Sequence, residues 1–359
     1  MPRKIDFDKN AVNALIQPFV ANREPGMLIR IYSSGQILFD KAFGLADMEE
    51  NRPLTRQTAF PVGSVSKEFT MVSILQFVEQ DKLHLHDTIG RFVEGLPFGS
   101  QVTIKHLLSH TSGIKNYFEK ANHIPGKLDR IFSPDELIRY FKNDPLEFPP
   151  GTRYQYSNSN YALLAKVIEQ FSKGSYSEHL QKTFFQPLEL EHSYSLLNTA
   201  PDKNTASGYD KRKDSITPTV KIHPSQTYGS GSVVSTLEDL YTWHQALYQG
   251  KLLSPKSFTM ACEVARLTDG SLSPEHRGFS LMSGQMGTHR FFWNGGDISG
   301  VHTRYLYFPE KELYIQVMAN VTIEDNHDHA GNLLFKIAGE LLGEDAVFVI
   351  GKEYQLEKL

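Results

Sequence analysis

Apolar positions along the chain follow two different periods, which predict helices in some segments and strands in others. Residues 11–21 have apolar side chains at helical spacing, whereas Met27–Tyr32 and Gln36–Phe43 are short apolar runs separated by serine and glycine. Such a gap is typical of a tight turn between two antiparallel strands. A helix is predicted at about 64–80, and apolar residues occupy most of its faces, as in helices buried between other elements.

The rest of the chain is mainly helical at first and returns to strands near its end. Between about 86 and 225 the pattern is one of helices and loops, with many prolines and glycines. The predicted helices are 103–109, 134–141, 160–172, 177–185, 236–248 and 328–342. The predicted late strands are Gly278–Met282, His289–Trp293, Gly300–Phe308 and Glu312–Asn320.

This order of elements predicts an α+β fold. Two early and four late strands can form one antiparallel sheet flanked by helices. We expect a single domain over residues 1–359, in which an all-helical subdomain at about 86–225 is inserted between sheet halves at about 10–85 and 226–345. A chain of 359 residues is long enough to bury a core of this size.

Composition excludes several classes of function. Hydrophobic residues make up 40% of the chain, charged residues 22%, and the formal net charge is −4, without a lysine- or arginine-rich block. We therefore expect no nucleic-acid partner, because phosphate binding needs a concentrated basic face. The N-terminus lacks a hydrophobic signal core and no apolar run reaches spanning length, so we expect no membrane span and a cytoplasmic location. The one cysteine, Cys262, lies in a helical pattern and is expected to be a buried apolar residue.

The first candidate for chemistry is the pair Ser64 and Lys67 at the start of the buried helix. A serine hydroxyl is a poor nucleophile until a base removes its proton. Residues three apart on a helix share a face, so the amine of Lys67 can reach the hydroxyl of Ser64. Burial lowers the pKa of a lysine and lets it act as that base. Taken alone, the same spacing also describes a serine N-cap followed by a solvent-facing lysine.

Two further segments carry polar groups suited to a cleft. Tyr156-Ser157-Asn158 precedes an apolar helix, and an extended backbone would point Tyr156 and Asn158 to the same side. The phenol can move a proton, and the amide can hold a substrate carbonyl. Asn294-Gly295-Gly296-Asp297 lies between two predicted strands, where paired glycines let a substrate lie against the backbone. Read separately, these two segments are a turn with a half-buried tyrosine and a glycine-rich hairpin turn.

Together the three segments resemble the serine β-lactamase and penicillin-binding-protein family, on its class C side, which includes family VIII esterases and D-amino-acid peptidases. The resemblance extends over about residues 10–342. It includes Phe43-Gly44-Leu45-Ala46-Asp47, Leu107-Leu108-Ser109-His110-Thr111-Ser112-Gly113 and Val234-Ser235-Thr236-Leu237-Glu238-Asp239-Leu240. The family fold is a mixed α/β domain and an all-helical domain with a cleft between them, in agreement with the pattern above.

The resemblance implies a role for each motif residue and no cofactor or metal. Ser64 is the expected nucleophile, Lys67 its base and Tyr156 a proton shuttle. Asn158 is expected to contact the substrate and Lys67. The backbone N–H groups of Ser64 and Asp297 are expected to form the oxyanion hole. The segment His327-Asp328-His329 suggests a metal, but it fits the capped start of the last helix better.

The third motif departs from the family pattern. Asn294 stands where the family usually has lysine or histidine, and it is expected to bind substrate together with Gly295 and Gly296. An asparagine keeps a hydrogen-bond donor but loses the charge that recognises the carboxylate of penicillins, at a cost of about 1–3 kcal/mol. Asp297 is a second departure, because a carboxylate close to an oxyanion would repel it unless the side chain points away.

These observations favour a serine hydrolase that forms an acyl-enzyme at Ser64 and acts on a small ester or amide, as an esterase or a D-amino-acid peptidase does. One alternative is a β-lactamase or penicillin-binding protein, because pocket loops rather than motifs set that choice. The other is a non-catalytic binding protein on the same fold, to which Asn294 lends support. The partner expected in the first case is a small ester or peptide, and the oligomeric state stays open.

Overall fold

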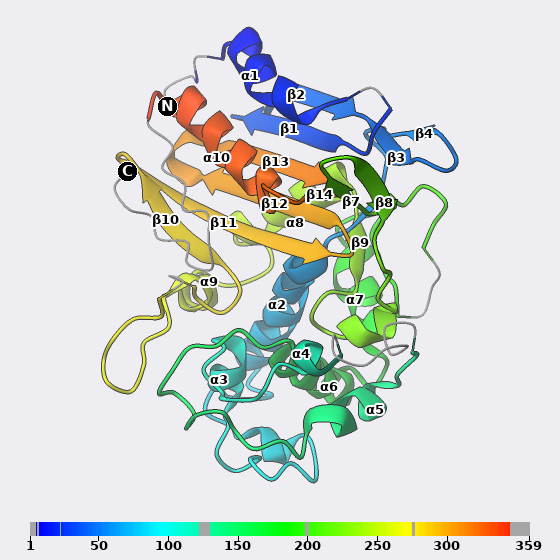
Figure 1. Ribbon diagram of the computed structural model, residues 1–359. Helices are drawn as coiled ribbons and strands as arrows, with labels where there is room; N and C mark the ends of the chain where they lie inside the picture. Colours follow the sequence, from blue (N-terminus) through cyan, green and yellow to red (C-terminus); the bar gives the residue numbers. More distant parts are fainter. Residues whose placement is uncertain are drawn as a thin grey trace.

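The computed structural model describes residue 5 and residues 7–21, 23–121, 130–197, 201–274 and 277–344. Its centre is a six-stranded antiparallel sheet in the order β10-β11-β12-β13-β1-β2 (Figure 1). The strands are β1 (Met27–Ser33), β2 (Gln36–Phe43), β10 (Met282–Met286), β11 (His289–Ile298), β12 (Val301–Phe308) and β13 (Leu313–Ala319). Two early and four late strands therefore share one sheet, and the predicted α+β fold is confirmed.

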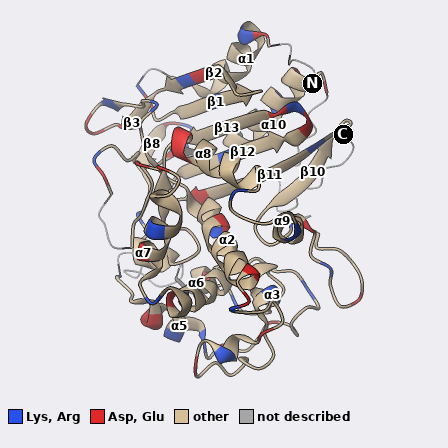
Figure 2. Cartoon of the chain, turned by 180° about the vertical axis from the view of Figure 1, so that it is seen from behind, with Lys and Arg blue, Asp and Glu red and all other residues tan. Residues whose placement is uncertain are grey.

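Helices cover both faces of this sheet. One face packs on α1 (Lys9–Ile16) and α10 (His329–Leu342), with a core that includes Val12, Ile29 and Leu333. The other face packs on α8 (Leu237–Tyr248), which Figure 2 shows from behind. The N-cap of α10 is Asp328, whose carboxylate accepts the N–H of Gly331, so the predicted capped start of this helix is confirmed.

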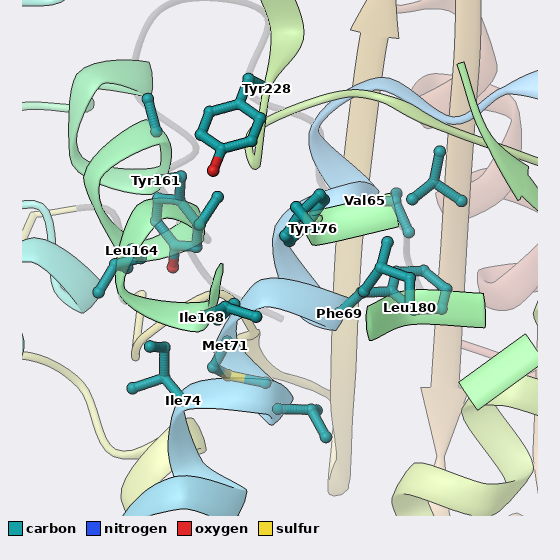
Figure 3. Packing of buried hydrophobic residues seen from close by; sticks show 14 of the residues in the cluster. Val65, Phe69, Met71, Ile74, Tyr161, Leu164, Ile168, Tyr176, Leu180 and Tyr228 are labelled. Atoms are coloured by element: carbon teal, nitrogen blue, oxygen red, sulfur yellow. The ribbon is translucent and has the colours of Figure 1, made fainter. Parts of the chain in front are cut away.

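The remaining helices gather at the other end of the molecule around α2 (Figure 1). They are α2 (Ser66–Glu79), α3 (Ile104–Leu108), α4 (Tyr117–Ala121), α5 (Pro134–Phe141), α6 (Asn158–Ser172), α7 (Tyr176–Leu180) and α9 (Pro255–Cys262). Helix α2 is buried along nearly its whole length, and its Phe69 belongs to the same buried cluster as Tyr161, Tyr176 and Leu180 (Figure 3). Cys262, at the end of α9, is 6% exposed, and burial raises the pKa of its thiol to about 12, which makes it an inert core residue.

Short strands pair outside the main sheet. They are β3 (Leu45–Asp47), β4 (Arg52–Pro53), β5 (Phe60–Pro61), β6 (Tyr194–Ser195), β7 (Tyr209–Arg212), β8 (Ser215–Pro218), β9 (Val233–Ser235) and β14 (Val321–Ile323). Among them, β9 pairs with both β5 and β6 and so ties the segment that leads into α2 to distant parts of the chain. Within the described ranges, no helix combines the length and the apolar character needed to cross a membrane.

Candidate active site

Ser64 lies in a single 3-10 turn, Gly63–Val65, that leads directly into α2. Gly63 has a φ of +51°, a conformation that glycine adopts without strain. The turn places the hydroxyl of Ser64 3.2 Å from Nζ of Lys67, on the first turn of the helix. The structure therefore brings together the pair that the spacing of three residues predicted.

Lys67 is fully enclosed and has three oxygen neighbours. Besides Ser64, its amine lies 2.8 Å from Oδ1 of Asn158 and 2.7 Å from the backbone carbonyl of Ser230. Burial lowers the pKa of Lys67 well below its ordinary value, and the charge of Arg277 lowers it further. The amine is therefore held ready to be neutral, as a general base must be.

Tyr156 contacts the same hydroxyl. Its phenol oxygen lies 2.6 Å from Oγ of Ser64. The ring of His110 stacks on it with centroids 4.5 Å apart, and Nδ1 of His110 accepts the backbone N–H of Ser157. The backbone N–H of Gln155 donates to the backbone carbonyl of the same histidine. His110 thus positions Tyr156.

For the neutral form of Lys67, counting hydrogen-bond donors places the protons between these three side chains. A neutral lysine amine has two N–H groups and one lone pair, and Oδ1 of Asn158 and the carbonyl of Ser230 can only accept. In this neutral form both N–H groups are used and the lone pair faces Ser64, whereas a protonated amine donates its third N–H group to Ser64. With the amine neutral, the hydroxyl of Ser64 donates to Lys67, and the phenol of Tyr156 donates to Ser64. This is the arrangement in which the serine is ready to lose its proton to the lysine.

Strand β11 brings the third motif against this turn. A Cβ placed on Gly296 would lie 2.6 Å from the backbone nitrogen of Ser64, and one placed on Gly63 would lie 2.7 Å from that of Asp297. Only glycine allows these backbones to approach so closely. The motif is part of the strand rather than a turn, since the hairpin turn is formed by Ser299 and Gly300.

Hairpin geometry shows where the N–H of Asp297 points. In a hairpin with a two-residue loop, the residues that flank the loop, here Ile298 and Val301, exchange hydrogen bonds, and the pattern alternates from there. Asp297 therefore directs its N–H away from β12. Strand β10 pairs with β11 only as far as Trp293, so β10 does not cover the edge of β11 to which the N–H of Asp297 points. The N–H groups of Ser64 and Asp297 lie close together, as a pair that can hold an oxyanion requires.

The carboxylate of Asp297 lies on the other face of the sheet, together with its cross-strand neighbours. Nδ1 of His302 donates to it at 2.6 Å, and Arg304 contacts both of its oxygens. Loss of solvent raises the pKa of the Asp297 carboxyl, but the charge of Arg304 and the hydrogen bond from His302 outweigh this and hold the pKa below its ordinary value. The negative charge is paired and turned away from Ser64, which resolves the conflict that the sequence posed.

The side chain of Asn294, which the sequence predicted to bind substrate, is buried and is not among the residues that line the cleft. Its side chain is 1% exposed; Nδ2 donates to Oε1 of Glu68 at 2.8 Å, and Oδ1 accepts the N–H of Gly295. The buried carboxylate of Glu68 needs donors, and Asn294 is one of them. Gly295 is covered on one face by the side chain of Arg304, and it is not among the residues that line the cleft either.

The cleft beside Ser64 has a volume of about 390 Å³. Polar groups on its wall include Tyr156, Asn158 and Thr227, and apolar surface comes from Phe118, Ile222 and Ile298. Among the described residues that line it, none is a lysine or an arginine. The guanidinium of Arg277 lies 5.7 Å from the ring centroid of Tyr156.

Sequence reasoning missed three contributors to this site. Ser230 acts through its backbone carbonyl, so its side chain carries no signal. Only the glycines on either side mark a closely packed loop, in which Gly229 lies against Tyr161 of α6. Arg277 lies far from the motifs in sequence. Glu68 follows Lys67 directly, and its charge within an otherwise apolar helix was a visible sign of a buried polar partner.

Comparison with known proteins agrees with this geometry. The profile of the Beta-lactamase family matches residues 12–338, and the chain belongs to that family. Penicillin-binding protein 4* of Bacillus subtilis (strain 168) is 30% identical over 302 residues, which are 78% of this chain and 65% of the relative. Protein flp of Staphylococcus aureus (strain MRSA252) is 25% identical over 309 residues, 84% of this chain and 60% of that protein. The chain thus spans less than two thirds of the length of these relatives.

Solved structures share the whole fold. The octameric penicillin-binding protein homologue from Pyrococcus abyssi superimposes with a TM-score of 0.81 at 26% identity, over 97% of this chain and 79% of that one. D-amino acid amidase from Ochrobactrum anthropi SV3 superimposes with a TM-score of 0.79 at 21% identity, over 92% of this chain and 98% of that one. The chain therefore has the fold of a β-lactamase-family serine hydrolase, and the resemblance inferred from its motifs is confirmed.

Proposed function

We propose that this protein hydrolyses a small ester or amide through an acyl-enzyme on Ser64. The observation that carries the proposal is the hydrogen-bonded chain from Tyr156 to Ser64 to Lys67, with separations of 2.6 and 3.2 Å. Such a chain activates a hydroxyl that is otherwise a weak nucleophile. A protein that only binds a ligand gains nothing from a buried lysine of lowered pKa, since burying it costs stability.

In the acylation step, Oγ of Ser64 attacks the substrate carbonyl carbon while its proton passes to Nζ of Lys67. The carbonyl oxygen takes up the electron pair and is held by the N–H groups of Ser64 and Asp297. Collapse of this intermediate breaks the bond to the alcohol or amine. Tyr156 donates its proton to that leaving group and regains one from Lys67, so the site returns to its starting charge with an acyl group on Ser64.

In the deacylation step, a water molecule attacks the acyl carbon. The neutral amine of Lys67 takes the proton of this water, and Oγ of Ser64 leaves and is reprotonated by the same amine. Asn158 links Lys67 to Asn116, whose Oδ1 accepts from both the backbone and the side chain of Asn158. This link keeps the amine in place while its proton moves.

The wall of the cleft favours uncharged groups close to the reacting carbon. Its aliphatic and aromatic residues, Phe118, Ile222 and Ile298, offer apolar contact, and no lysine or arginine is among the described lining residues. The histidine of the lining, His302, already pairs with the carboxylate of Asp297. An unpaired carboxylate loses solvent at a high cost on entering such a cleft. Short-chain esters and small amides should therefore be hydrolysed more efficiently than penicillins, although for a different reason from the one that Asn294 suggested.

Covalent labelling tests the proposal. Incubation with a fluorophosphonate should give one adduct, and mass spectrometry of the digested protein should place it on the peptide that contains Ser64. Ser64→Ala is the control and should remain unlabelled. In parallel, kcat/KM for p-nitrophenyl butyrate should exceed that for nitrocefin. An adduct on another serine would overturn the assignment of Ser64, and faster turnover of nitrocefin would overturn the proposed substrate class.

A further inference from the structure

Glu68 is a fully buried carboxylate beside the site, and the mechanism above does not use it. It is 0% exposed and follows Lys67 on α2. Successive residues of a helix point about 100° apart, so Lys67 faces the cleft while Glu68 faces the sheet. A buried carboxylate is retained only when its oxygens are satisfied.

Four donors from three elements satisfy it. Oε2 accepts Nε1 of Trp243 at 3.1 Å and Nε2 of His244 at 3.0 Å, both from α8. Oε1 accepts Nδ2 of Asn294 on β11 and the hydroxyl of Tyr305 on β12, each at 2.8 Å. Burial raises the pKa of Glu68, but the interaction with His244 and the hydrogen bonds outweigh it and hold the pKa below its ordinary value. The ionised carboxylate of Glu68 therefore links α2 to α8, β11 and β12, and it is called the anchor below.

The contact with Asn294 joins the two halves of the oxyanion hole. One half, the N–H of Ser64, belongs to the turn that opens α2, four residues before Glu68. The other, the N–H of Asp297, lies three residues beyond Asn294 on β11. Both connecting segments are regular and stiff, so the position of α2 against β11 sets the separation of the two donors. Oxyanion stabilisation is sensitive to that separation.

We infer that Glu68 is a positioning residue that holds α2 against β11 and thereby sets the geometry of the oxyanion hole, an inference that rests on the proposed function. Its effect should be confined to the transition state, because the oxyanion forms only there. Loss of the anchor should therefore lower kcat and leave KM nearly unchanged. A merely structural role would lower the melting temperature without this split.

Reciprocal substitutions test the anchor. In Glu68→Gln, one oxygen becomes an NH₂ group that faces donors, and in Asn294→Asp two carboxylates face each other, so each single variant loses the α2–β11 contact. In Glu68→Gln/Asn294→Asp the amide introduced on α2 can donate to the carboxylate introduced on β11, and the contact returns with reversed polarity. The matched control is Asp239→Asn, which alters a buried carboxylate of α8 that accepts from His192 and Ser193 rather than from β11.

The measurements are kcat and KM for p-nitrophenyl butyrate and the rate of fluorophosphonate labelling. We expect kcat of Glu68→Gln to fall by about 10²-fold, the size of losing one oxyanion donor, with KM within about 3-fold of wild type. The double variant should recover at least 10-fold of that loss (roughly 1.4 kcal/mol), and Asp239→Asn should retain kcat. Wild-type kcat in Glu68→Gln, or no recovery in the double variant, would overturn the inference and leave the proposed function standing. An unlabelled, inactive wild type would instead overturn the proposed function and this inference with it.

Two near-isosteric variants keep the test open if Glu68→Gln does not fold. Asn294→Leu and Tyr305→Phe each remove one donor from the same oxygen, but only Asn294 lies on the strand that carries Asp297. A positioning role requires a larger loss of kcat in Asn294→Leu than in Tyr305→Phe. Equal losses would show that the cluster serves stability alone.

Discussion

At the scale of single residues, the site depends on what surrounds each motif side chain more than on its identity. Lys67 can act as a base because two oxygens that can only accept, from Asn158 and Ser230, occupy both N–H groups of its neutral amine. A spacing of three residues predicts that Ser64 and Lys67 meet, because helix geometry alone decides it. It cannot show the partner of Asn294, since Glu68 is 226 positions away and meets it only through the tertiary fold.

The proton path through Lys67 and Tyr156 leads to the first prediction at this scale. Lys67→Ala should lower kcat for p-nitrophenyl butyrate by at least about 10²-fold, as expected for loss of a general base. Tyr156→Phe should also lower kcat, because it removes the donor to Ser64 and to the leaving group. Circular dichroism should show both variants folded. Near wild-type rates in both at neutral pH would require a different base.

The charge of Arg277 leads to a prediction about pH. A nearby cation disfavours the protonated amine, so Arg277 helps to lower the pKa of Lys67, after burial. Activity requires the neutral amine and should rise with pH through this pKa. Arg277→Ala should raise the pKa and move the acidic limb of the profile of kcat/KM to higher pH, whereas Arg277→Lys, which keeps the charge, should leave the limb nearly in place. A shift to lower pH in Arg277→Ala would contradict this view.

At the scale of elements, periodicity predicted the long helices and most strands of the main sheet. It predicted β10 four residues too early, at Gly278–Met282 instead of Met282–Met286, because short apolar runs do not mark their own ends. It ended β11 at Trp293, because glycines normally weaken strands. Gly296 is in the strand because the turn around Ser64 packs directly against it, and Gly295 lies under the side chain of Arg304.

The close approach of β11 to that turn can be tested at Gly296. A methyl group there would lie 2.1 Å from the carbonyl oxygen of Val62 and 2.6 Å from the nitrogen of Ser64, so the strand and the turn must move apart. Gly296→Ala should therefore lower kcat by about 10²-fold, the usual effect of losing one oxyanion donor. Gly174→Ala is the control, because Gly174 does not have a positive φ and an added methyl group meets only the flexible side chain of Glu178. Unchanged kcat in Gly296→Ala would mean that the donor pair does not depend on this contact.

At the scale of the whole molecule, the sheet and the surrounding helices together bury α2. This burial lowers the pKa of Lys67. Catalysis and stability are therefore in conflict at this one position. The unfolded chain carries a protonated lysine up to its ordinary pKa of about 10.4, whereas the folded chain releases that proton at a lower pH. Between the two pKa values the unfolded state binds one more proton, so the stability of the folded state rises with pH.

The size of this rise gives the last prediction. One extra proton in the unfolded state corresponds to a slope of about 1.4 kcal/mol per pH unit in the free energy of unfolding. Lys67→Met removes the titrating group but leaves all others. Urea unfolding measured in steps from pH 7 to 10 should show the free energy of unfolding of wild type rising relative to that of the variant, by about that amount per unit between the two pKa values. The absolute difference also includes the acceptors of Asn158 and Ser230 that methionine leaves unpaired, which is why the slope is the quantity to measure. Parallel pH curves would show that Lys67 keeps its charge in the folded protein, and a lysine that stays charged cannot be the base for Ser64.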